Sequence, residues 1–156
     1  MTRSLDELLA DVPVLQSLDA DEIALVAGCG KNTHFAAGDL LFREGAPADV
    51  FFVIRHGIVA LELHVPARGT VTIETLEAGE LLGWSWLFPP YRWHFDARAL
   101  ADVRATEFDA ACLRGKCDAD PVLGYRLMGR FAQVIIERLQ ATRLRLLDVY
   151  GDGDAR

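Results

Sequence analysis

Three tryptophans lie close together between two strand-like segments, and this loop holds the residues best able to do chemistry. All of the tryptophan in the chain is here, at Trp84, Trp86 and Trp93, beside the proline pair Pro89 and Pro90. Loops normally carry polar turn residues, so an aromatic loop is typical of a lined binding pocket rather than a plain connection. We expect any ligand of this protein to bind near this loop.

Anion binding is the first chemistry that the loop offers. Arg92 could hold an anion, assisted by the Ser85 hydroxyl and by loop amides. The alternative is a surface arginine that stacks on Trp93 or Tyr91. The tryptophans leave a similar choice, because they can line a pocket for a flat or apolar ligand, or fill the cavity and close it. The sequence leaves both alternatives open.

Metal binding and catalysis have weaker support. His94 and Asp96 would share one face of a strand, as two ligands of a non-haem iron site do. No histidine follows His94, because the other three all precede it. Ser85 and His94 are neighbours only in sequence, so no nucleophile–base pair stands out. We therefore expect no metal and no enzymatic activity, and a half-buried, hydrogen-bonded histidine at position 94.

Composition narrows the class of protein. The chain has 156 residues, 51% of them hydrophobic, which is enough for one domain with a full core. A formal net charge of -7 argues against nucleic-acid binding, since phosphate contacts dominate that affinity. Three cysteines without paired spacing, Cys29, Cys112 and Cys117, predict reduced thiols. The acidic N-terminus and the lack of roughly 20 consecutive apolar residues predict a cytoplasmic protein without a membrane span.

The spacing of apolar residues changes along the chain from a helical to an alternating pattern, and this change predicts the elements that position the loop. Residues 1–34 have the pattern of N-terminal helices, capped by Ser4 and by either Asp19 or Asp21. Residues 35–110 alternate in short segments separated by glycine-containing turns at roughly 8–12-residue spacing, as in an antiparallel β-sandwich or barrel.

Residues 118–150 are predicted to be helical, with Asp120 and Pro121 as the start signal. A helix of about 30 residues spans roughly 45 Å, longer than a domain of this size can cover. We therefore favour a homodimer through this helix over a helix that only covers its own sheet. The apolar stripe is close to a heptad seam and consists of Phe131, Ile135, Leu139, Thr142, Leu146 and Val149.

Five motifs give this order of elements a family resemblance. They are LQSLDADEI (15–23), FAAGDLLFREG (35–45) followed by Ala48 and Asp49, FFVIRHG (51–57), LEAGELLG (76–83) and RLQAT (138–142). Together they resemble the cyclic nucleotide-binding domain family, and more narrowly the sensor half of Crp/Fnr (catabolite activator) proteins. The resemblance implies one domain over residues 1–156. It would be mainly β, with an antiparallel, cupin-like jelly roll, flanking helices and a long C-terminal dimer helix.

The resemblance also implies a phosphate-binding cassette after Gly83. In the family, a short helix N-terminus and an arginine hold the cyclic phosphate, and a carboxylate directly after the glycine binds the ribose 2′-hydroxyl. This chain departs from that pattern, because tryptophan follows the glycine. The family arginine aligns with either of two adjacent residues, at positions 92 and 93. The candidate ligand-binding residues are Gly83, Trp84, Ser85, Trp86, Arg92, Trp93, His94 and Thr142.

These features predict a small-molecule-sensing regulatory module that needs no cofactor. Its ligand would be a cyclic nucleotide (cAMP or cGMP) or another small anion, although losing the ribose carboxylate costs a ribose ligand a few kcal/mol. The alternative is a protein-interaction module that kept the fold while tryptophans filled the cavity. The sequence ends soon after the long helix, without room for a helix-turn-helix domain. We therefore expect the signal to pass to a partner protein rather than to DNA.

Overall fold

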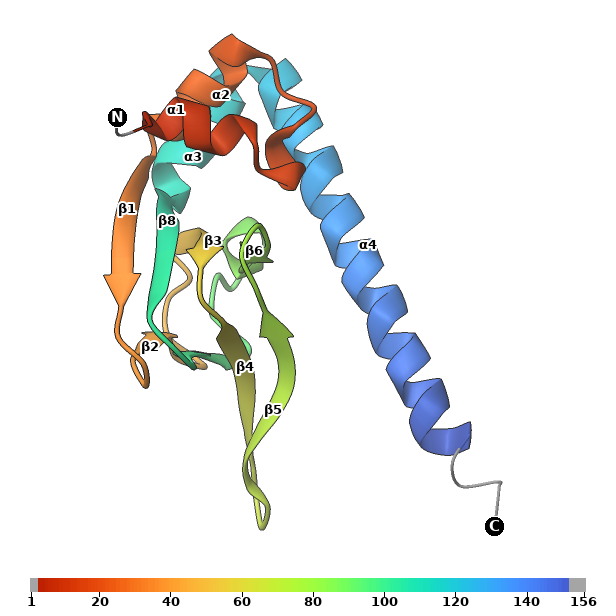
Figure 1. Cartoon of the computed structure of the whole chain (residues 1–156). Helices are drawn as coiled ribbons and strands as arrows, with labels where there is room; N and C mark the ends of the chain where they lie inside the picture. The colour runs from red at the N-terminus through yellow and green to blue at the C-terminus, as the bar shows by residue number, and fades with distance from the viewer. Residues whose placement is uncertain (1–2, 152–156) are drawn as a thin grey trace.

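Two four-stranded antiparallel sheets form the centre of the molecule, and helices precede and follow them (Figure 1). The computed structural model describes residues 3–151. The sheets have the strand orders β1-β8-β3-β6 and β2-β7-β4-β5, which confirms the predicted jelly roll. The strands are β1 (Gly30–Phe35), β2 (Leu40–Phe42), β3 (Val50–His56), β4 (Val59–Val65), β5 (Gly69–Leu76), β6 (Leu81–Leu82), β7 (Asp96–Ala99) and β8 (Val103–Asp109).

The N-terminal segment forms α1 (Leu5–Ala10), the 3₁₀ helix η1 (Pro13–Leu15) and α2 (Ala20–Ala27). Both α-helices begin with a capping box: Ser4 caps α1 as predicted, and Asp19, one of the two predicted candidates, caps α2. The Ser4 and Asp19 side chains accept hydrogen bonds from the backbone N–H groups of Glu7 and Glu22. The two glutamates return a bond to the cap backbone, which satisfies donors that a helix N-terminus otherwise leaves free.

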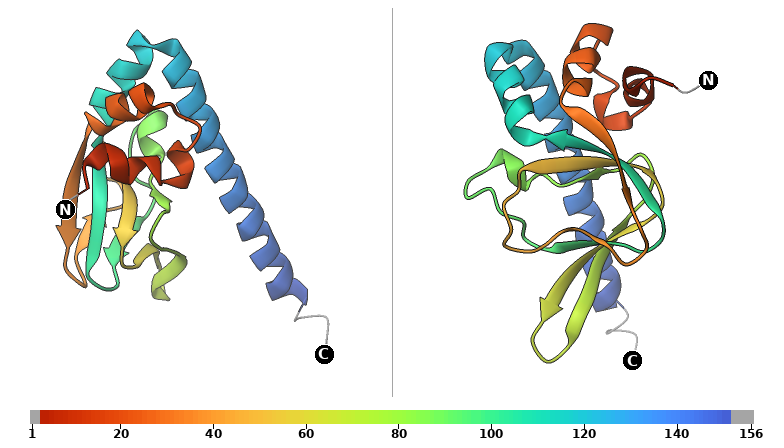
Figure 2. Two further views of the ribbon diagram at one scale, coloured as in Figure 1. Left: turned by 45° about the horizontal axis from the view of Figure 1, so that its top comes forward. Right: turned by 90° about the vertical axis from the view of Figure 1, so that its left-hand side faces the viewer.

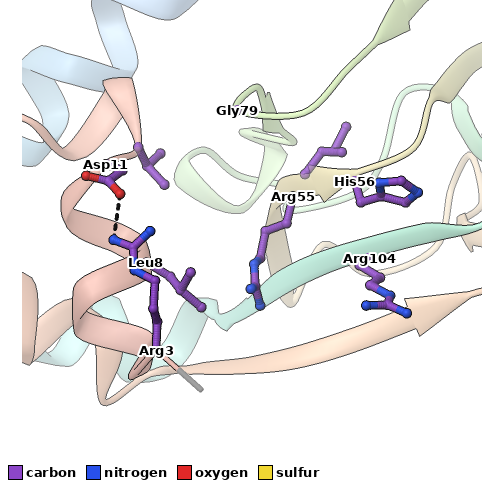
Figure 3. A pocket seen from close by; sticks show the side chains of 9 residues that line it. Arg3, Leu8, Asp11, Arg55, His56, Gly79 and Arg104 are labelled. Atoms are coloured by element: carbon purple, nitrogen blue, oxygen red, sulfur yellow. Dashed lines mark hydrogen bonds and ion pairs between the residues drawn. The ribbon is translucent and has the colours of Figure 1, made fainter. Parts of the chain in front are cut away.

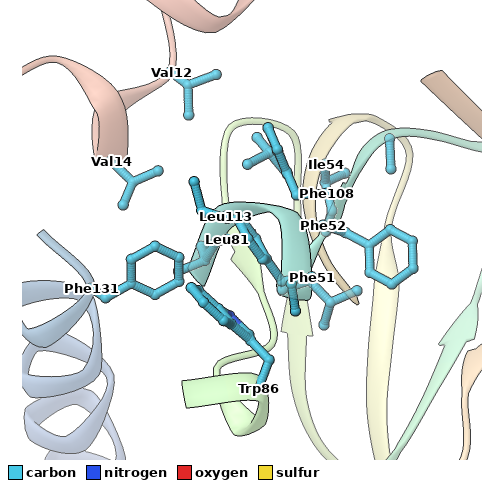
Figure 4. Packing of buried hydrophobic residues seen from close by; sticks show 14 of the residues in the cluster. Val12, Val14, Phe51, Phe52, Ile54, Leu81, Trp86, Phe108, Leu113 and Phe131 are labelled. Atoms are coloured by element: carbon cyan, nitrogen blue, oxygen red, sulfur yellow. The ribbon is translucent and has the colours of Figure 1, made fainter. Parts of the chain in front are cut away.

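The core lies between the sheets and continues onto the C-terminal helix. Phe51 of β3 stacks on Trp86 and on Phe108, with ring centroids 4.9 and 4.7 Å apart. Phe131 meets Trp86 edge-on at 5.4 Å. Figure 4 shows Phe131 pointing from its helix toward Trp86 and Leu81. The aromatic loop is therefore built into the main core rather than laid over it.

The C-terminal helices are α3 (Ala110–Ala119) and α4 (Pro121–Gly151). Asp120 accepts a hydrogen bond from the Leu123 N–H at 3.2 Å, which confirms the predicted start of the long helix. The first half of α4 packs against α3 and η1. Its second half leads away from the N-terminal helices (Figures 1 and 2) and contacts the roll through Arg138 and Arg145, whose side chains donate to the Leu81 and Ile73 carbonyls. No helix within residues 3–151 is both long enough and apolar enough to cross a membrane.

Two predicted boundaries are wrong. The sequence places helices up to residue 34, but β1 begins at Gly30 and pairs with β8 along its whole length. Gly30 allows this pairing, because a Cβ there would lie 3.1 Å from the Phe108 ring. Helical structure also resumes at Ala110, eight residues before the predicted start, because the Asp109 side chain caps α3 through the Cys112 N–H.

The prediction of three reduced thiols is also wrong. Cys29 and Cys112 form a disulfide, with their Cα atoms 5.7 Å apart. Pairing of β1 with β8 brings these residues together, and the Asp109 N–H donates to the Cys29 carbonyl at 2.9 Å. Cys117 is unpaired, and burial raises its pKa above the usual value. The cysteine content therefore gives no support to a reducing compartment.

Candidate functional site

The predicted cassette begins at Gly83, directly after β6. Gly83 has φ of +97°, a left-handed conformation that favours glycine. The 3₁₀ helix η2 (Ser85–Leu87) follows, and it is only three residues long. A Cβ at Gly83 would lie 2.7 Å from the Trp93 ring, so the backbone and this indole are in close contact.

Trp93 fills the interior of the roll beside the cassette. Its side chain is only 3% exposed, and its ring stacks on Phe42 with the centroids 3.8 Å apart and the planes 9° apart. Its backbone N–H donates to the Ala46 carbonyl, and its carbonyl accepts from the Gly45 N–H. These bonds fix the segment against the turn after β2, with the Trp93 indole facing inward.

Arg92 points the other way. Its side chain is exposed, and its Nη1 donates to the Gly45 carbonyl at 2.7 Å. Of the two residues that align with the family arginine, the inward one is therefore the tryptophan. Within the described residues, Arg92 makes no cation–π contact with Trp93 or Tyr91. The Tyr91 ring is covered by Arg114 instead, whose Cζ lies 5.0 Å from the ring centroid.

Very little space remains at the centre of the predicted site. The cavity there has a volume of about 30 Å³. One buried water needs about 10–15 Å³ on this measure, whereas pockets for small-molecule ligands are typically about 300–1,000 Å³. The cavity is lined by Leu61, Gly83, Trp84, Ser85, Trp93, His94, Phe95 and Arg138.

Arg138 connects the long helix to the cassette. Its Nη2 donates to the Leu81 carbonyl oxygen, and its Cζ lies 5.0 Å from the centroid of the Trp84 ring. Burial lowers the pKa of the Arg138 guanidinium, while the carboxylates of Glu74 and Glu80 act in the opposite direction. This half-buried charge is therefore stabilised by a carbonyl, an aromatic face and nearby acids.

The structure brings most of the predicted site residues together. Five of the eight line the small cavity: Gly83, Trp84, Ser85, Trp93 and His94. Trp86 is fully buried in the main core instead. Arg92 and Thr142 lie outside the cavity, and Thr142 is exposed, with its hydroxyl donating to the Arg138 carbonyl at 2.9 Å.

Sequence reasoning missed Leu61, Phe95 and Arg138 as lining residues. Arg138 is the residue that α4 contributes, and it lies one turn before Thr142 in the same motif. Residues four apart lie on the same side of a helix, so the prediction of Thr142 as a site residue could have been extended to Arg138. Leu61 and Phe95 carried no signal beyond their apolar character.

The described residues offer no metal centre at this site or elsewhere. Within residues 3–151, no group of three or more histidine, cysteine, aspartate and glutamate side chains is arranged to hold a metal ion. The prediction of a half-buried histidine at position 94 is wrong, because His94 is exposed at the edge of the small cavity. The Asp96 carboxylate accepts the Glu44 backbone N–H at 2.7 Å, so it already has a structural partner.

Comparisons with known proteins identify the family of this chain. The family model described as the cyclic nucleotide-binding domain matches residues 32–120, more than half of the chain. Glutaminase 1 of Bradyrhizobium diazoefficiens is 32% identical over 133 residues, which cover 84% of this chain and 21% of the glutaminase. A CRP-like cAMP-activated global transcriptional regulator of Mycobacterium tuberculosis is 25% identical over 145 residues, 93% of this chain and 63% of the regulator. The chain thus spans only part of both relatives.

A solved structure extends the comparison to three dimensions. The N-terminal domain of a transcriptional regulator from Streptomyces coelicolor has 25% sequence identity and a TM-score of 0.69, and the match covers 90% of this chain and 95% of that domain. The match covers most of both chains, so the two share their fold. On the family match and this likeness, the chain belongs to the cyclic nucleotide-binding domain family.

Proposed function

We propose that this chain is a regulatory module that works without a cyclic nucleotide, because its own tryptophans occupy the nucleotide's place. The observation that carries the proposal is the position of Trp93. Its buried ring lies between Phe42 and the Gly83 backbone and leaves a cavity of about 30 Å³. Of the two functions that the sequence leaves open, this geometry favours the filled cavity over the open pocket.

The charges around the site support the same proposal. Trp84 stands where the family resemblance implies a ribose-binding carboxylate, and Arg92 points away from the cassette. Arg138 is the one arginine that lines the cavity, and its guanidinium already contacts the Leu81 carbonyl and the Trp84 ring. A bound phosphate would have to displace these contacts.

The larger groove beside the cassette does not suit an anion either. It has a volume of about 410 Å³ and lies between α4 and the turn before β6. Its charged lining consists of Glu74, Glu80, Glu137 and Arg138. Three carboxylates against one guanidinium would repel a cyclic phosphate.

A nucleotide titration tests the proposal. We expect neither cAMP nor cGMP at millimolar concentration to raise the thermal unfolding temperature or to quench tryptophan emission. A ligand at 100 times its Kd would stabilise the fold by about 2.7 kcal/mol, which such an assay detects easily. A saturable shift with either nucleotide would contradict the proposal and support the small-molecule sensor.

A restoring variant serves as the matched control. The double substitution Trp84→Glu and Trp93→Arg returns the two residue types that the family resemblance implies. If the tryptophans are what closes the site, this variant should respond to a cyclic nucleotide while the native chain does not. A response from the native chain equal to that of the variant would show that the tryptophans do not obstruct the site.

Arg138 gives the proposed module a defined link between cassette and helix. We expect Arg138→Met to lower the free energy of unfolding by about 1–2 kcal/mol, because it removes a cation–π contact and a charged hydrogen bond while keeping the apolar stem. Hydrogen exchange should become faster at residues 81–84 and in the second half of α4.

Arg143→Met is the control for this prediction, since Arg143 is an exposed arginine on the same helix. It should change neither the unfolding free energy nor the exchange pattern. Equal effects of the two substitutions, or unchanged exchange at residues 81–84 in Arg138→Met, would contradict the proposed link.

The proposed output is a homodimer formed by α4. Phe131, which the periodicity places in the seam, instead packs in the core of its own chain. The exposed side of α4 nevertheless carries a regular heptad seam with alternating spacings of three and four. It consists of Tyr125, Met128, Ala132, Ile135, Leu139, Thr142, Leu146 and Val149. A heptad seam is complementary to a second copy of itself, which makes another chain of this protein the expected partner.

A further inference from the structure

A row of basic and titratable side chains crosses the outer face of the sheet that contains β1, β8 and β3. Arg104 of β8 pairs with His34 of β1 on one side and with His56 of β3 on the other. Directly opposed residues on antiparallel strands point to the same face of the sheet. All three side chains are exposed. Because neighbouring strands lie about 4.8 Å apart, the row spans roughly 10 Å.

A β-bulge adds Arg55 to this row. The register of β3 against β8 shifts between Ile54 and His56, so Arg55 has no residue directly opposite it. Bulges redirect side chains, and here both Arg55 and His56 are exposed while Ile54 stays in the core. In Figure 3, Arg55 lies between Arg104 and Arg3, which precedes α1.

These four residues, His34, Arg55, His56 and Arg104, form what we call the basic strip. Two concave regions meet along it, with volumes of about 530 and 570 Å³. The first lies between the N-terminal helices and β3, the second lies over β1, and both are lined by Arg55 and Arg104. Since the lining side chains of the strip are exposed, neither region encloses a small molecule as ligand pockets do.

The carboxylates beside the strip already have partners. Asp11 forms an ion pair with Arg3 at 2.6 Å, and Asp102 forms one with His34 at 2.6 Å. Both carboxylates are therefore paired with side chains other than Arg55 and Arg104. Arg55 and Arg104 place two positive charges side by side on this face, in a chain whose formal net charge is -7 with histidine counted as neutral.

The two central arginines are left to hold an external anion. Among the described residues, the Arg55 side chain donates only to the neutral Asn32 amide oxygen, at 2.6 Å. Within residues 3–151, the Arg104 side chain makes no hydrogen bond or ion pair, since the nearby Asp102 carboxylate is bonded to His34. Two guanidinium groups on neighbouring strands match the geometry of two carboxylates, each of which can accept a pair of N–H bonds.

We propose that the basic strip binds an acidic segment of a partner protein, with Arg55 and Arg104 each holding a carboxylate. The open, elongated shape fits an extended peptide, and the charge is complementary to acidic residues. The site lies on the outer face of the sheet, so it does not depend on whether the cavity inside the roll holds a ligand.

The test uses a fluorescein-labelled hexaglutamate peptide and measures fluorescence anisotropy at low ionic strength, because salt screens exposed charge pairs. We expect saturable binding that the double substitution Arg55→Gln and Arg104→Gln weakens about tenfold. The matched control, Arg43→Gln with Arg68→Gln, removes the same charge from two exposed arginines elsewhere and should change the affinity less than about twofold. Unfolding temperatures of all variants should agree within a few degrees.

Two results would overturn the proposal. Equal weakening by the two double variants would mean that the peptide responds only to net charge. Tighter binding of inorganic phosphate or of a single-stranded oligonucleotide than of hexaglutamate would show that the strip prefers phosphate oxygens to an acidic peptide. Loss of binding in the Arg55/Arg104 variant alone, with hexaglutamate the preferred probe, supports the acidic segment.

Discussion

Replacing Trp93 by alanine is expected to lower the free energy of unfolding by about 3–5 kcal/mol, the range typical of buried aromatic side chains. The indole is almost fully buried, stacks on Phe42 and lies against the Gly83 backbone. Neither neighbour can move into the vacated space, because Phe42 belongs to β2 and Gly83 has no side chain. The substitution should therefore leave a cavity rather than allow the site to collapse.

Urea denaturation measures this loss, and Trp84→Ala is the matched control. Trp84 is only half-buried, and its main specific contact is the Arg138 guanidinium, so its loss should cost about 1–2 kcal/mol. A Trp93→Ala effect no larger than that of Trp84→Ala would show that the Trp93 indole is not a structural part of the closed site.

Chemical rescue gives a second measurement on the same variant. An apolar cavity left by a buried side chain can bind a small aromatic molecule. Indole at millimolar concentration should therefore raise the unfolding temperature of Trp93→Ala and leave that of the native chain unchanged. Stabilisation of the native chain by indole would mean that the site is open without any substitution.

Local sequence signals predicted the fold well because they act over a few residues. The Ser4 and Asp19 caps, the alternation of the strands and the Asp120–Pro121 helix start all depend on neighbours within one turn or one strand. The long-range features were different. The disulfide joins cysteines separated by 83 residues, and only the pairing of β1 with β8 brings them together.

The direction of the loop side chains could not be predicted for the same reason. Trp93 faces the interior because its backbone pairs with Ala46, 47 residues earlier in the chain. Shifting that pairing by one residue would exchange Trp93 with Arg92, since neighbouring residues of an extended segment face opposite sides. The sequence contains both residues and holds no local signal that selects between them.

The long helix carries two apolar stripes, one buried and one exposed, and the sequence pattern does not separate them. Leu123, Leu127 and Phe131 follow a spacing of four and pack into the core of their own chain. The exposed seam follows alternating spacings of three and four, and it passes close to the first stripe near Ile135. A periodicity read from Phe131 onward therefore begins on the buried stripe and continues on the exposed one. Only the burial of Phe131 separates the two.

The double substitution Leu139→Glu and Leu146→Glu is expected to convert the proposed dimer into a monomer. Leu139 and Leu146 are 47% and 53% exposed in the single chain, so the substitutions disturb little within the protomer. In a paired seam they would place four carboxylates in an apolar interface, which should weaken association at least about 100-fold. Sedimentation equilibrium measures the mass, and circular dichroism verifies that the helix content is unchanged.

Leu144→Glu distinguishes association through the heptad seam from nonspecific hydrophobic association of α4. Leu144 is 62% exposed, more than either seam leucine, but it lies five residues after Leu139, on the side of the helix away from the seam. A parallel or antiparallel pair built on the seam should tolerate this charge, and the mass should stay that of a dimer. If Leu144→Glu dissociates the chains as strongly as the seam variant, or if the native chain sediments as a monomer, α4 does not dimerise through this heptad. The output of the module would then have to pass through another surface, such as the basic strip.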